Sequence, residues 1–177
     1  DTEVYSNTGG QSSKSSNIGS IASFATSGKK TNKKDLARIA MSYKNVYVAQ
    51  INLGANMMQV IKTLKEANDY NGPSIVIAYS PCISHGIKGG MSNSLSNAKL
   101  ATDSGYFLTF RRNPETGFTL DSKNVDFEKF DEFLFNQTRY SNLKKVNKDE
   151  ALELLKLNKE NAKEKYEYYS SLQKVNN

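Results

Sequence analysis

The chain is poor in the residues that build disulfide frameworks and most catalytic sets. Its 177 residues include one cysteine, one histidine, three prolines and no tryptophan. A single cysteine, Cys82, excludes an internal disulfide framework and is typical of a reducing compartment, so we expect a cytoplasmic protein. With His85 as the only histidine and no positioned partner evident, we expect a structural rather than a catalytic role for this side chain. Walker and GxGxxG phosphate loops are also absent from the sequence.

Long hydrophobic runs are missing as well. No stretch of 18 apolar residues occurs, which excludes a membrane-spanning helix. The first residues contain no basic region followed by an apolar one, so we expect no secretory signal, and the lack of an initial Met predicts a processed chain or a part of a longer one. With 37% hydrophobic and 24% charged residues, the composition is that of a folded domain, or of one α/β part of a larger protein.

The net charge of +6 is concentrated near the N-terminus. Residues 14–44 contain one acidic residue, Asp35, against seven basic ones: Lys14, Lys29, Lys30, Lys33, Lys34, Arg38 and Lys44. One interpretation is a nucleic-acid-binding module, because clustered cations attract phosphate backbones. The other is a solvated face or a contact with an acidic protein, in particular at residues 29–34. Only four of the 24 basic residues are Arg, the usual reader of phosphates and guanine edges, so we expect no nucleic acid.

Hydrophobic periodicity predicts an α/β fold after a polar segment at residues 6–32. The expected helices cover residues 33–41, 56–70 and 91–104, and the expected strands cover residues 46–51, 74–79 and 106–110. Strands and helices alternating at this spacing indicate a three-layer sandwich with a mostly parallel sheet and helices on its faces. We expect this α/β domain to span residues 1–125.

The last third of the chain predicts a helical extension, residues 126–177. An aromatic-rich amphipathic segment covers residues 127–135, and an apolar stripe runs along a long helix at residues 148–173. The charges of this helix nearly cancel, with five Lys against six acidic residues, whereas a helix on a membrane surface needs a cationic polar face. We therefore expect the extension to pack on the α/β domain or on a neighbouring subunit.

Ligands of open α/β sheets bind beyond the carboxyl ends of strands, which directs attention to residues 5–11, 52–56 and 80–90. In the opening segment, the Thr2 hydroxyl and the Val4 carbonyl are two residues apart and suit Mg²⁺, which prefers oxygen ligands. Cys82 follows a buried strand. Its thiol is either a small buried hydrophobe or one ligand of a metal site that is completed elsewhere.

Several motifs together resemble one family. The opening segment, DTEVYSNTGGQSSK at residues 1–14, resembles the thiamine-diphosphate loop of pyruvate:ferredoxin (flavodoxin) oxidoreductases. The likeness continues through SGKKT (27–31), VYVAQ (46–50), AYSPCISHG (78–86), KGGM (88–91), FTLDSK (118–123) and RYSNL (139–143). It covers nearly the whole chain, and the opening segment and the Cys82 loop are its most specific parts.

The resemblance implies an activity. The family converts pyruvate and coenzyme A to acetyl-CoA and CO₂ in anaerobic metabolism, and passes two electrons through iron–sulfur clusters to ferredoxin or flavodoxin. Its fold is the thiamine-diphosphate-binding fold, of which this chain would be the C-terminal part. The cofactors would be thiamine diphosphate, Mg²⁺ and a 4Fe-4S cluster, and the full enzyme would be a homodimer.

The resemblance also assigns residues. Thr2 would bind Mg²⁺ through its side-chain oxygen and Val4 through its carbonyl. The segment lining the cofactor would comprise Thr2, Glu3, Val4, Tyr5, Ser6 and Asn7. Asn7 would be the catalytic residue that positions substrate, and Cys82 would be the distant ligand of the 4Fe-4S cluster nearest the cofactor.

Some parts of the family's site are not in the sequence. The Gly-Asp-Gly motif, which opens the thiamine-diphosphate site and supplies a third Mg²⁺ ligand, should lie upstream of Asp1, and the other cluster cysteines are also missing. We therefore expect a fragment of a larger enzyme that is inactive by itself. Two alternatives stay open, which are the same chemistry on another 2-oxoacid and a nucleic-acid-binding module.

Overall fold

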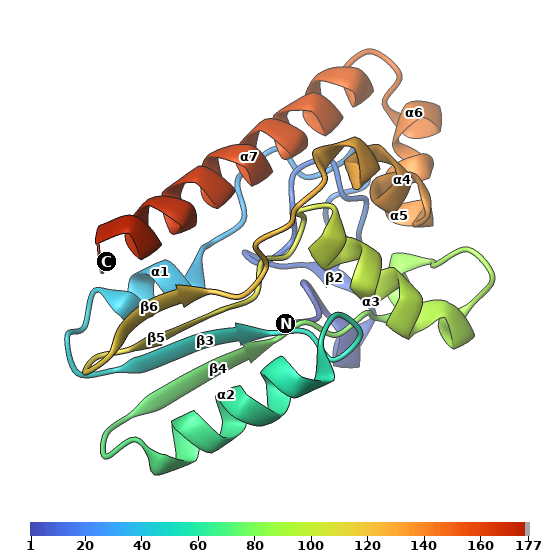
Figure 1. Cartoon of the computed structure of the whole chain (residues 1–177). Coiled ribbons are helices and arrows are strands. Elements are labelled where there is room, and N and C mark those ends of the chain that lie inside the picture. Colours follow the sequence, from blue (N-terminus) through green and yellow to red (C-terminus); the bar gives the residue numbers. More distant parts are fainter. Residues whose placement is uncertain (176–177) are drawn as a thin grey trace.

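The computed structural model describes residues 1–175 and shows an α/β fold whose four-stranded sheet has helices on both faces (Figure 1). The order of strands in this sheet is β4-β3-β5-β6. Its strands are β3 (Tyr47–Ile51), β4 (Ser74–Ala78), β5 (Phe110–Asn113) and β6 (Gly117–Leu120). The α/β class expected from the sequence is confirmed.

The first half of the sheet forms as its hydrophobic pattern predicts. All five residues of β3 are buried, and β3 pairs in parallel with β4. Helix α2 (Met57–Asp69) connects these two strands and packs against both. It begins where the Asn56 side chain accepts a hydrogen bond from the backbone N–H of Gln59, which satisfies a donor that the helix leaves free.

The prediction of a mostly parallel sheet is wrong, because the sheet is mixed. Strand β5 runs antiparallel to β3, and β6 runs antiparallel to β5. The strand expected at residues 106–110 lies instead at Phe110–Asn113. Helix α3 (Ser94–Asp103) does not cross over the sheet to restore the strand direction. It lies at the carboxyl end of β3, where the Asn52 amide donates to the Ala98 carbonyl, and the chain then enters the sheet in the opposite direction.

The long C-terminal helix is confirmed as α7 (Ala151–Val175). Together with α1 (Leu36–Met41) it covers the face of the sheet opposite α2 (Figure 1). The fully buried Tyr169 of α7 stacks on Phe110 of β5, with ring centroids 4.5 Å apart. Because α7 is docked on the sheet through this cluster, the C-terminal segment is part of the same core.

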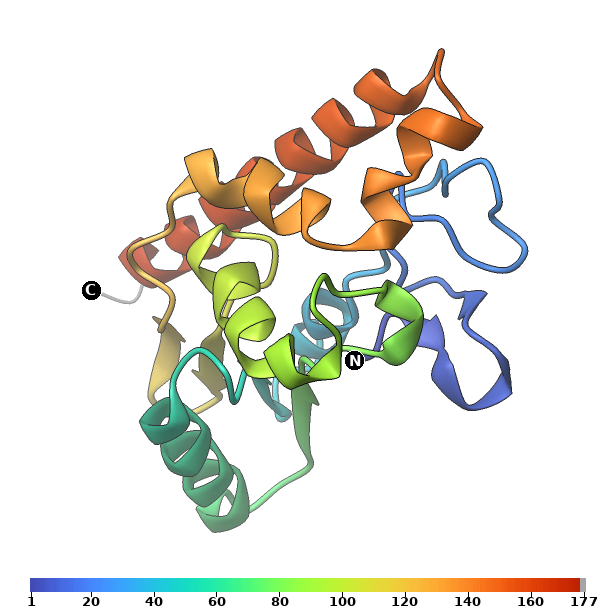
Figure 2. The ribbon, with the colours of Figure 1, turned by 90° about the vertical axis from the view of Figure 1, so that its right-hand side faces the viewer.

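A second hydrophobic cluster lies beyond the edge of the sheet at which the parallel strands β3 and β4 end. Three short helices contribute to it, α4 (Phe130–Phe135), α5 (Thr138–Ser141) and α6 (Leu143–Val146), and they lie between α3 and α7 (Figure 2). Tyr106 is central, since its ring contacts those of Phe133 and Tyr140. This cluster supports the N-terminal segment, which forms a small hairpin of β1 (Val4–Tyr5) and β2 (Gln11–Ser12). Among residues 1–175, no helix is long and apolar enough to cross a membrane.

Candidate functional site

The N-terminal hairpin presents an exposed turn next to the loop that contains Cys82. Residues 5–8 are exposed, and their turn ends on Gly9, which has a left-handed backbone (φ 114°). Gly10 follows, also at positive φ, and a Cβ atom there would lie 2.5 Å from the Ser84 hydroxyl. Only glycine therefore allows this close approach between the hairpin and the Cys82 loop.

The two oxygens expected to bind Mg²⁺ lie side by side. The Thr2 hydroxyl donates to the Val4 carbonyl oxygen, and the two atoms are 3.0 Å apart. Adjacent ligands in an octahedron with metal–oxygen distances near 2.1 Å are separated by about 2.9 Å. The spacing fits two neighbouring positions of a Mg²⁺ ion, and binding would require the Thr2 hydroxyl hydrogen to turn away from the Val4 carbonyl.

His85 joins the two loops. It is fully buried, its Nδ1 atom accepts a hydrogen bond from the Cys82 backbone N–H (3.3 Å), and its Nε2 atom lies 2.9 Å from the Thr2 carbonyl oxygen. Since Nδ1 accepts, the neutral ring carries its proton on Nε2 and donates it to Thr2. Burial and the nearby charge of Arg139 lower the pKa of His85 to about 4, so the imidazole is neutral at physiological pH. These contacts give His85 the structural role expected from the sequence.

Cys82 is a buried free thiol at the start of a 3-10 turn, Ile83–His85. Its sulfur accepts a hydrogen bond from the backbone N–H of Ser84 at 3.4 Å. Within residues 1–175, no three His, Cys, Asp or Glu side chains are grouped so that they could hold a metal ion. Cys82 thus offers one sulfur ligand, and further ligands of a cluster would have to come from other parts of a larger protein.

Glu3, between the two Mg²⁺ ligand candidates, is a buried charge in an unusual backbone conformation. Its φ of 63° lies in the left-handed region, which is rare for a non-glycine residue. The carboxylate contacts Arg139 Nη1 at 2.6 Å, Lys33 Nζ at 3.1 Å and the Tyr106 hydroxyl at 2.8 Å. Burial opposes ionisation, but the charges of Lys33 and Arg139 outweigh it and hold the pKa of the Glu3 carboxyl well below its usual range.

The backbone of Glu3 is equally engaged. Its N–H donates to the Asp1 carboxylate, and its carbonyl oxygen accepts from the hydroxyls of Ser13 and Ser16. Every polar atom of Glu3 thus has a partner within the protein, and the side chain points into the interior. Glu3 therefore holds the loop in place. Its membership of the segment that lines the cofactor stays a prediction, and its inward-pointing side chain would not contact the cofactor directly.

Several basic side chains of residues 14–44 make contacts within the chain. The Lys29 ammonium donates to the carbonyls of Ser13 and Ser16, and Lys33 pairs with Asp1 as well as Glu3. Lys30 pairs with Glu150, and Arg38 lies over the ring of Tyr168. Four of the seven basic side chains thus have partners in the chain, and two of these, Lys29 and Lys33, are drawn into the interior, which weakens the nucleic-acid interpretation.

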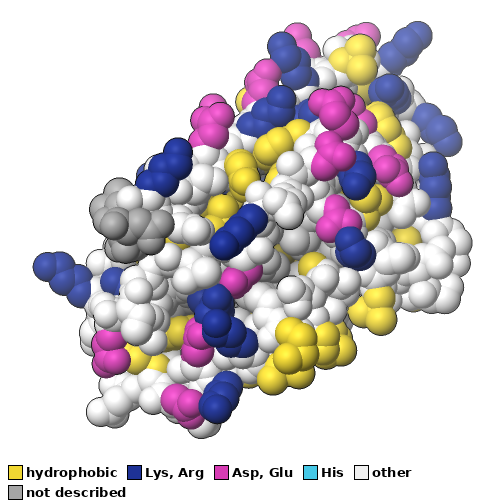
Figure 3. All heavy atoms as spheres, in the orientation of Figure 1, with side chains coloured by type: hydrophobic (Ala, Val, Ile, Leu, Met, Phe, Trp, Pro, Cys, Tyr) yellow, Lys and Arg dark blue, Asp and Glu magenta, His cyan; other side chains and the backbone are white. Residues whose placement is uncertain are grey.

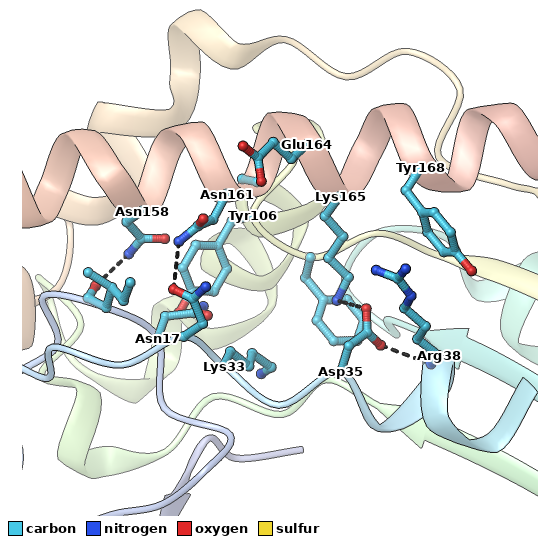
Figure 4. Close-up of a pocket in the computed structure, with 14 residues that line it drawn as sticks. Asn17, Lys33, Asp35, Arg38, Tyr106, Asn158, Asn161, Glu164, Lys165 and Tyr168 are labelled. Atoms are coloured by element: carbon cyan, nitrogen blue, oxygen red, sulfur yellow. Dashed lines mark hydrogen bonds and ion pairs between the residues drawn. The ribbon is translucent and has the colours of Figure 1, made fainter. Parts of the chain in front are cut away.

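A polar cavity of about 240 Å³ lies between α7 and the segment that precedes α1. Figure 4 shows Asp35, Arg38 and Lys165 facing one another there. The Lys165 ammonium lies 3.3 Å from the Asp35 carboxylate, which also accepts a hydrogen bond from Tyr169. Sequence reasoning did not identify this cavity. Through these two contacts Asp35 joins α7 to the loop that carries Lys33.

Comparison with known proteins agrees with the resemblance. No protein-family model matches the chain. It is 46% identical over 97% of its residues to the pyruvate-flavodoxin oxidoreductase of Klebsiella pneumoniae, and equally to the pyruvate:ferredoxin oxidoreductase of Moorella thermoacetica. A pyruvate dehydrogenase [NADP(+)] of Euglena gracilis is 47% identical over 83% of the chain. The chain spans about 15% of the length of the first two relatives and 8% of the third. With this identity along almost its whole length, the chain belongs, as a fragment, to the family of pyruvate-flavodoxin and pyruvate:ferredoxin oxidoreductases.

Proposed function

We propose that this chain supplies part of the thiamine diphosphate–Mg²⁺ site and one iron–sulfur ligand of an enzyme that oxidatively decarboxylates pyruvate. The observation that carries the proposal is the link through His85. This side chain connects the Thr2 loop, whose two oxygens are spaced for Mg²⁺, to the backbone of Cys82. A metal–diphosphate site and a thiolate ligand would thereby be held at a fixed separation, as electron transfer from one to the other requires.

The proposal assigns a role to five residues of the loop. Thr2 and Val4 hold the Mg²⁺ ion, which neutralises diphosphate charge, while the exposed Tyr5, Ser6 and Asn7 line the cofactor. Thiamine diphosphate, when bound, supplies the carbon nucleophile and the electron sink for decarboxylation. Asn7 lies on the exposed turn, where its amide can hydrogen-bond and orient a 2-oxoacid.

Cys82 serves the electron-transfer half of the proposal. Its thiolate would bind one iron of a 4Fe-4S cluster, with the other ligands outside this chain. The hydrogen bond from the Ser84 N–H to the sulfur would reduce the negative charge on the ligand and favour the reduced cluster.

The substrate and partners follow from the relatives' names and remain proposals for this chain. Pyruvate is in every name quoted above, whereas the acceptors named differ between flavodoxin, ferredoxin and NADP(+). We propose pyruvate and coenzyme A as substrates, ferredoxin or flavodoxin as acceptor, and a cytoplasmic homodimer of the full enzyme. The alternative is the same chemistry on another 2-oxoacid.

The Mg²⁺ assignment is tested by Thr2→Ala and Thr2→Ser in the longer protein. We expect Thr2→Ala to raise the Mg²⁺ concentration needed for pyruvate-dependent reduction of the acceptor by about tenfold or more, while Thr2→Ser keeps the hydroxyl and the affinity. Thr8→Ala is the matched control, because this exposed hydroxyl belongs to the same loop but bonds only within it. An unchanged Mg²⁺ requirement in Thr2→Ala would contradict the assignment.

The cluster assignment is tested by Cys82→Ala, compared with Ile83→Ala, whose exposed side chain adjoins it. We expect Cys82→Ala to lower the iron-to-protein ratio and abolish transfer to the acceptor, and Ile83→Ala to change neither. Full iron content with normal turnover in Cys82→Ala would show that the Cys82 thiol is a small buried hydrophobic group and not a ligand of a cluster.

A further inference from the structure

The polar cavity between α7 and the segment before α1 has no part in the proposed function. Its volume, about 240 Å³, is below the roughly 300–1,000 Å³ of pockets that hold drug-sized ligands, so it suits a smaller molecule. Tyr106, Phe107 and Asn158 line it as buried residues, whereas Asn161 and Arg38 lie nearer the surface. The cavity thus combines buried aromatic rings with a few polar groups, which is typical of sites for small molecules.

Arg38 contributes a guanidinium that is held in place but not neutralised. The guanidinium carbon lies 4.1 Å from the centre of the Tyr168 ring, and the backbone N–H of Arg38 donates to Asp35. Among residues 1–175, the guanidinium itself has no hydrogen-bond or ion-pair partner. A guanidinium stacked on a ring keeps its N–H donors free, and these donors match the two oxygens of a carboxylate.

Lys165 is the second cation of the cavity, and Figure 4 shows it facing Arg38. Its Nζ atom lies 3.3 Å from the Asp35 carboxylate, which is shared, because it also accepts the Tyr169 hydroxyl at 2.9 Å. Burial lowers the pKa of Lys165, and the charge of Lys33 adds to this effect, although Asp35 raises the pKa. One carboxylate thus lies beside two cations, and one positive charge is left without compensation.

The other charged residues of the lining do not compensate it. Lys33 is directed to Asp1 and Glu3, at 2.6 and 3.1 Å. Glu164 is exposed, forms no ion pair within residues 1–175, and points away from Arg38 in Figure 4. The cavity differs in this respect from the face in Figure 3, where basic and acidic side chains are interspersed. A group with a single negative charge suits the cavity better than a dianion, whose second charge would be repelled by the nearby carboxylate.

We propose that this cavity binds a small monocarboxylate between Arg38 and Lys165. The carboxylate would accept two hydrogen bonds from the Arg38 guanidinium and one from Lys165 Nζ. The short carbon chain would lie against the ring of Phe107, and a polar substituent on it would face the amides of Asn158 and Asn161.

The bound molecule would join two elements of the fold. Arg38 belongs to α1 and Lys165 to α7. A ligand that contacts both recognises only the docked arrangement, so it stabilises the folded protein by mass action. None of the residues that line the cavity is assigned to Mg²⁺, thiamine diphosphate or the cluster. The proposal therefore stands or falls separately from the proposed function.

The test is labelling of the longer protein with phenylglyoxal, which forms a covalent adduct with free guanidinium groups, followed by peptide mass spectrometry. With propionate as the probe, at constant ionic strength, the labelling rate at Arg38 should fall by about threefold when two thirds of the sites are occupied. Arg112 is the control, because its guanidinium already donates to three backbone carbonyls, and its rate should not change.

Three results of this labelling would overturn the proposal. Equal protection of Arg38 by chloride would show general screening of charge. Stronger protection by phosphate than by propionate would show a site for dianions. A lack of labelling at Arg38 without any added anion would show that another part of the longer protein fills the cavity.

Variants of Lys165 test the second contact. Lys165→Gln should abolish the protection of Arg38 by propionate and the rise in thermal midpoint that propionate causes, while Lys165→Arg should keep both. Lys163→Gln is the matched control, because this lysine also belongs to α7 and lies over an aromatic ring, that of Phe127, but does not line the cavity. Undiminished protection in a folded Lys165→Gln variant, or its loss in Lys165→Arg, would contradict a site built on these two cations.

Discussion

Arg139 Nη1 lies 2.6 Å from Glu3 Oε2, and both side chains are at most 1% exposed. Removing one partner of such a pair leaves the other charge buried without compensation, at a cost of about 3–5 kcal/mol. We therefore expect Glu3→Gln to lower the free energy of unfolding by about this amount, measured by urea denaturation.

The control for this prediction is a double substitution. Replacing both charges, Glu3→Gln with Arg139→Met, leaves no uncompensated ion, so the double variant should be more stable than the sum of the single losses predicts. Strict additivity would show that the two side chains do not interact energetically.

His85 predicts a pH dependence of stability. Its pKa is about 4 in the folded protein, below the ordinary value near 6.5, so the unfolded chain binds more protons between these two values. Its stabilising effect is complete above pH 6.5 and decreases as the pH falls towards 4, by about 3 kcal/mol in all. Urea midpoints measured between pH 7.5 and 5 should fall accordingly, and His85→Gln should flatten this dependence. An equally steep fall in His85→Gln would assign it to other groups.

Two glycines near the Cys82 loop separate backbone strain from crowding. Gly86 and Gly90 both have positive φ, but a Cβ atom at Gly86 would lie 1.8 Å from the Thr138 hydroxyl, whereas one at Gly90 meets nothing within 4 Å. Gly86 has a left-handed helical backbone (φ 64°, ψ 57°), which alanine adopts at a modest cost, whereas the backbone of Gly90 (φ 87°, ψ −174°) suits glycine almost alone. Thermal denaturation should show Gly86→Ala destabilised by about 1–3 kcal/mol, mainly because the loop is forced away from α5, and Gly90→Ala destabilised by about 1–3 kcal/mol through backbone strain alone. An unchanged midpoint in Gly86→Ala would mean that the loop shifts without cost.

The docking of α7 is tested at Tyr169. Its hydroxyl donates to both oxygens of Asp35, at 3.0 and 2.9 Å, while its ring stacks on Phe110. Tyr169→Phe keeps the ring and removes the hydrogen bonds to a charged group, so we expect a loss of about 1.5–3 kcal/mol in unfolding experiments. Tyr43→Phe, at an exposed ring, should change little.

The parts of the fold that could be predicted are those with strong local periodicity. The hydrophobic run of β3, the apolar stripe of α2 and the run of β4 each show their structure within a dozen residues. Hydrophobic periodicity did not predict the hairpin of β5 and β6, because polar residues interrupt the pattern there. Arg111 is paired there with Glu66 and Asp121, and no local pattern reveals such distant partners.

The candidate site, too, could be predicted from the sequence only where its residues are close together in the chain. Thr2 and Val4 are two residues apart, so their proximity was visible in the sequence. The partners of Glu3 lie 30, 103 and 136 positions away, at Lys33, Tyr106 and Arg139, and only the folded chain brings them together. The inward direction of Glu3 depends on its positive φ, for which the sequence carries no signal.

The ion pair between Glu3 and Arg139 also defines how far the chain can be shortened. Any cleavage that removes the segment after α4 takes away the cation that compensates Glu3, although the loop itself would be untouched. The smallest autonomous unit that keeps the Thr2–Val4 geometry must therefore extend from Asp1 at least through Arg139. An engineer who transplants this loop into another scaffold would have to carry its distant arginine with it.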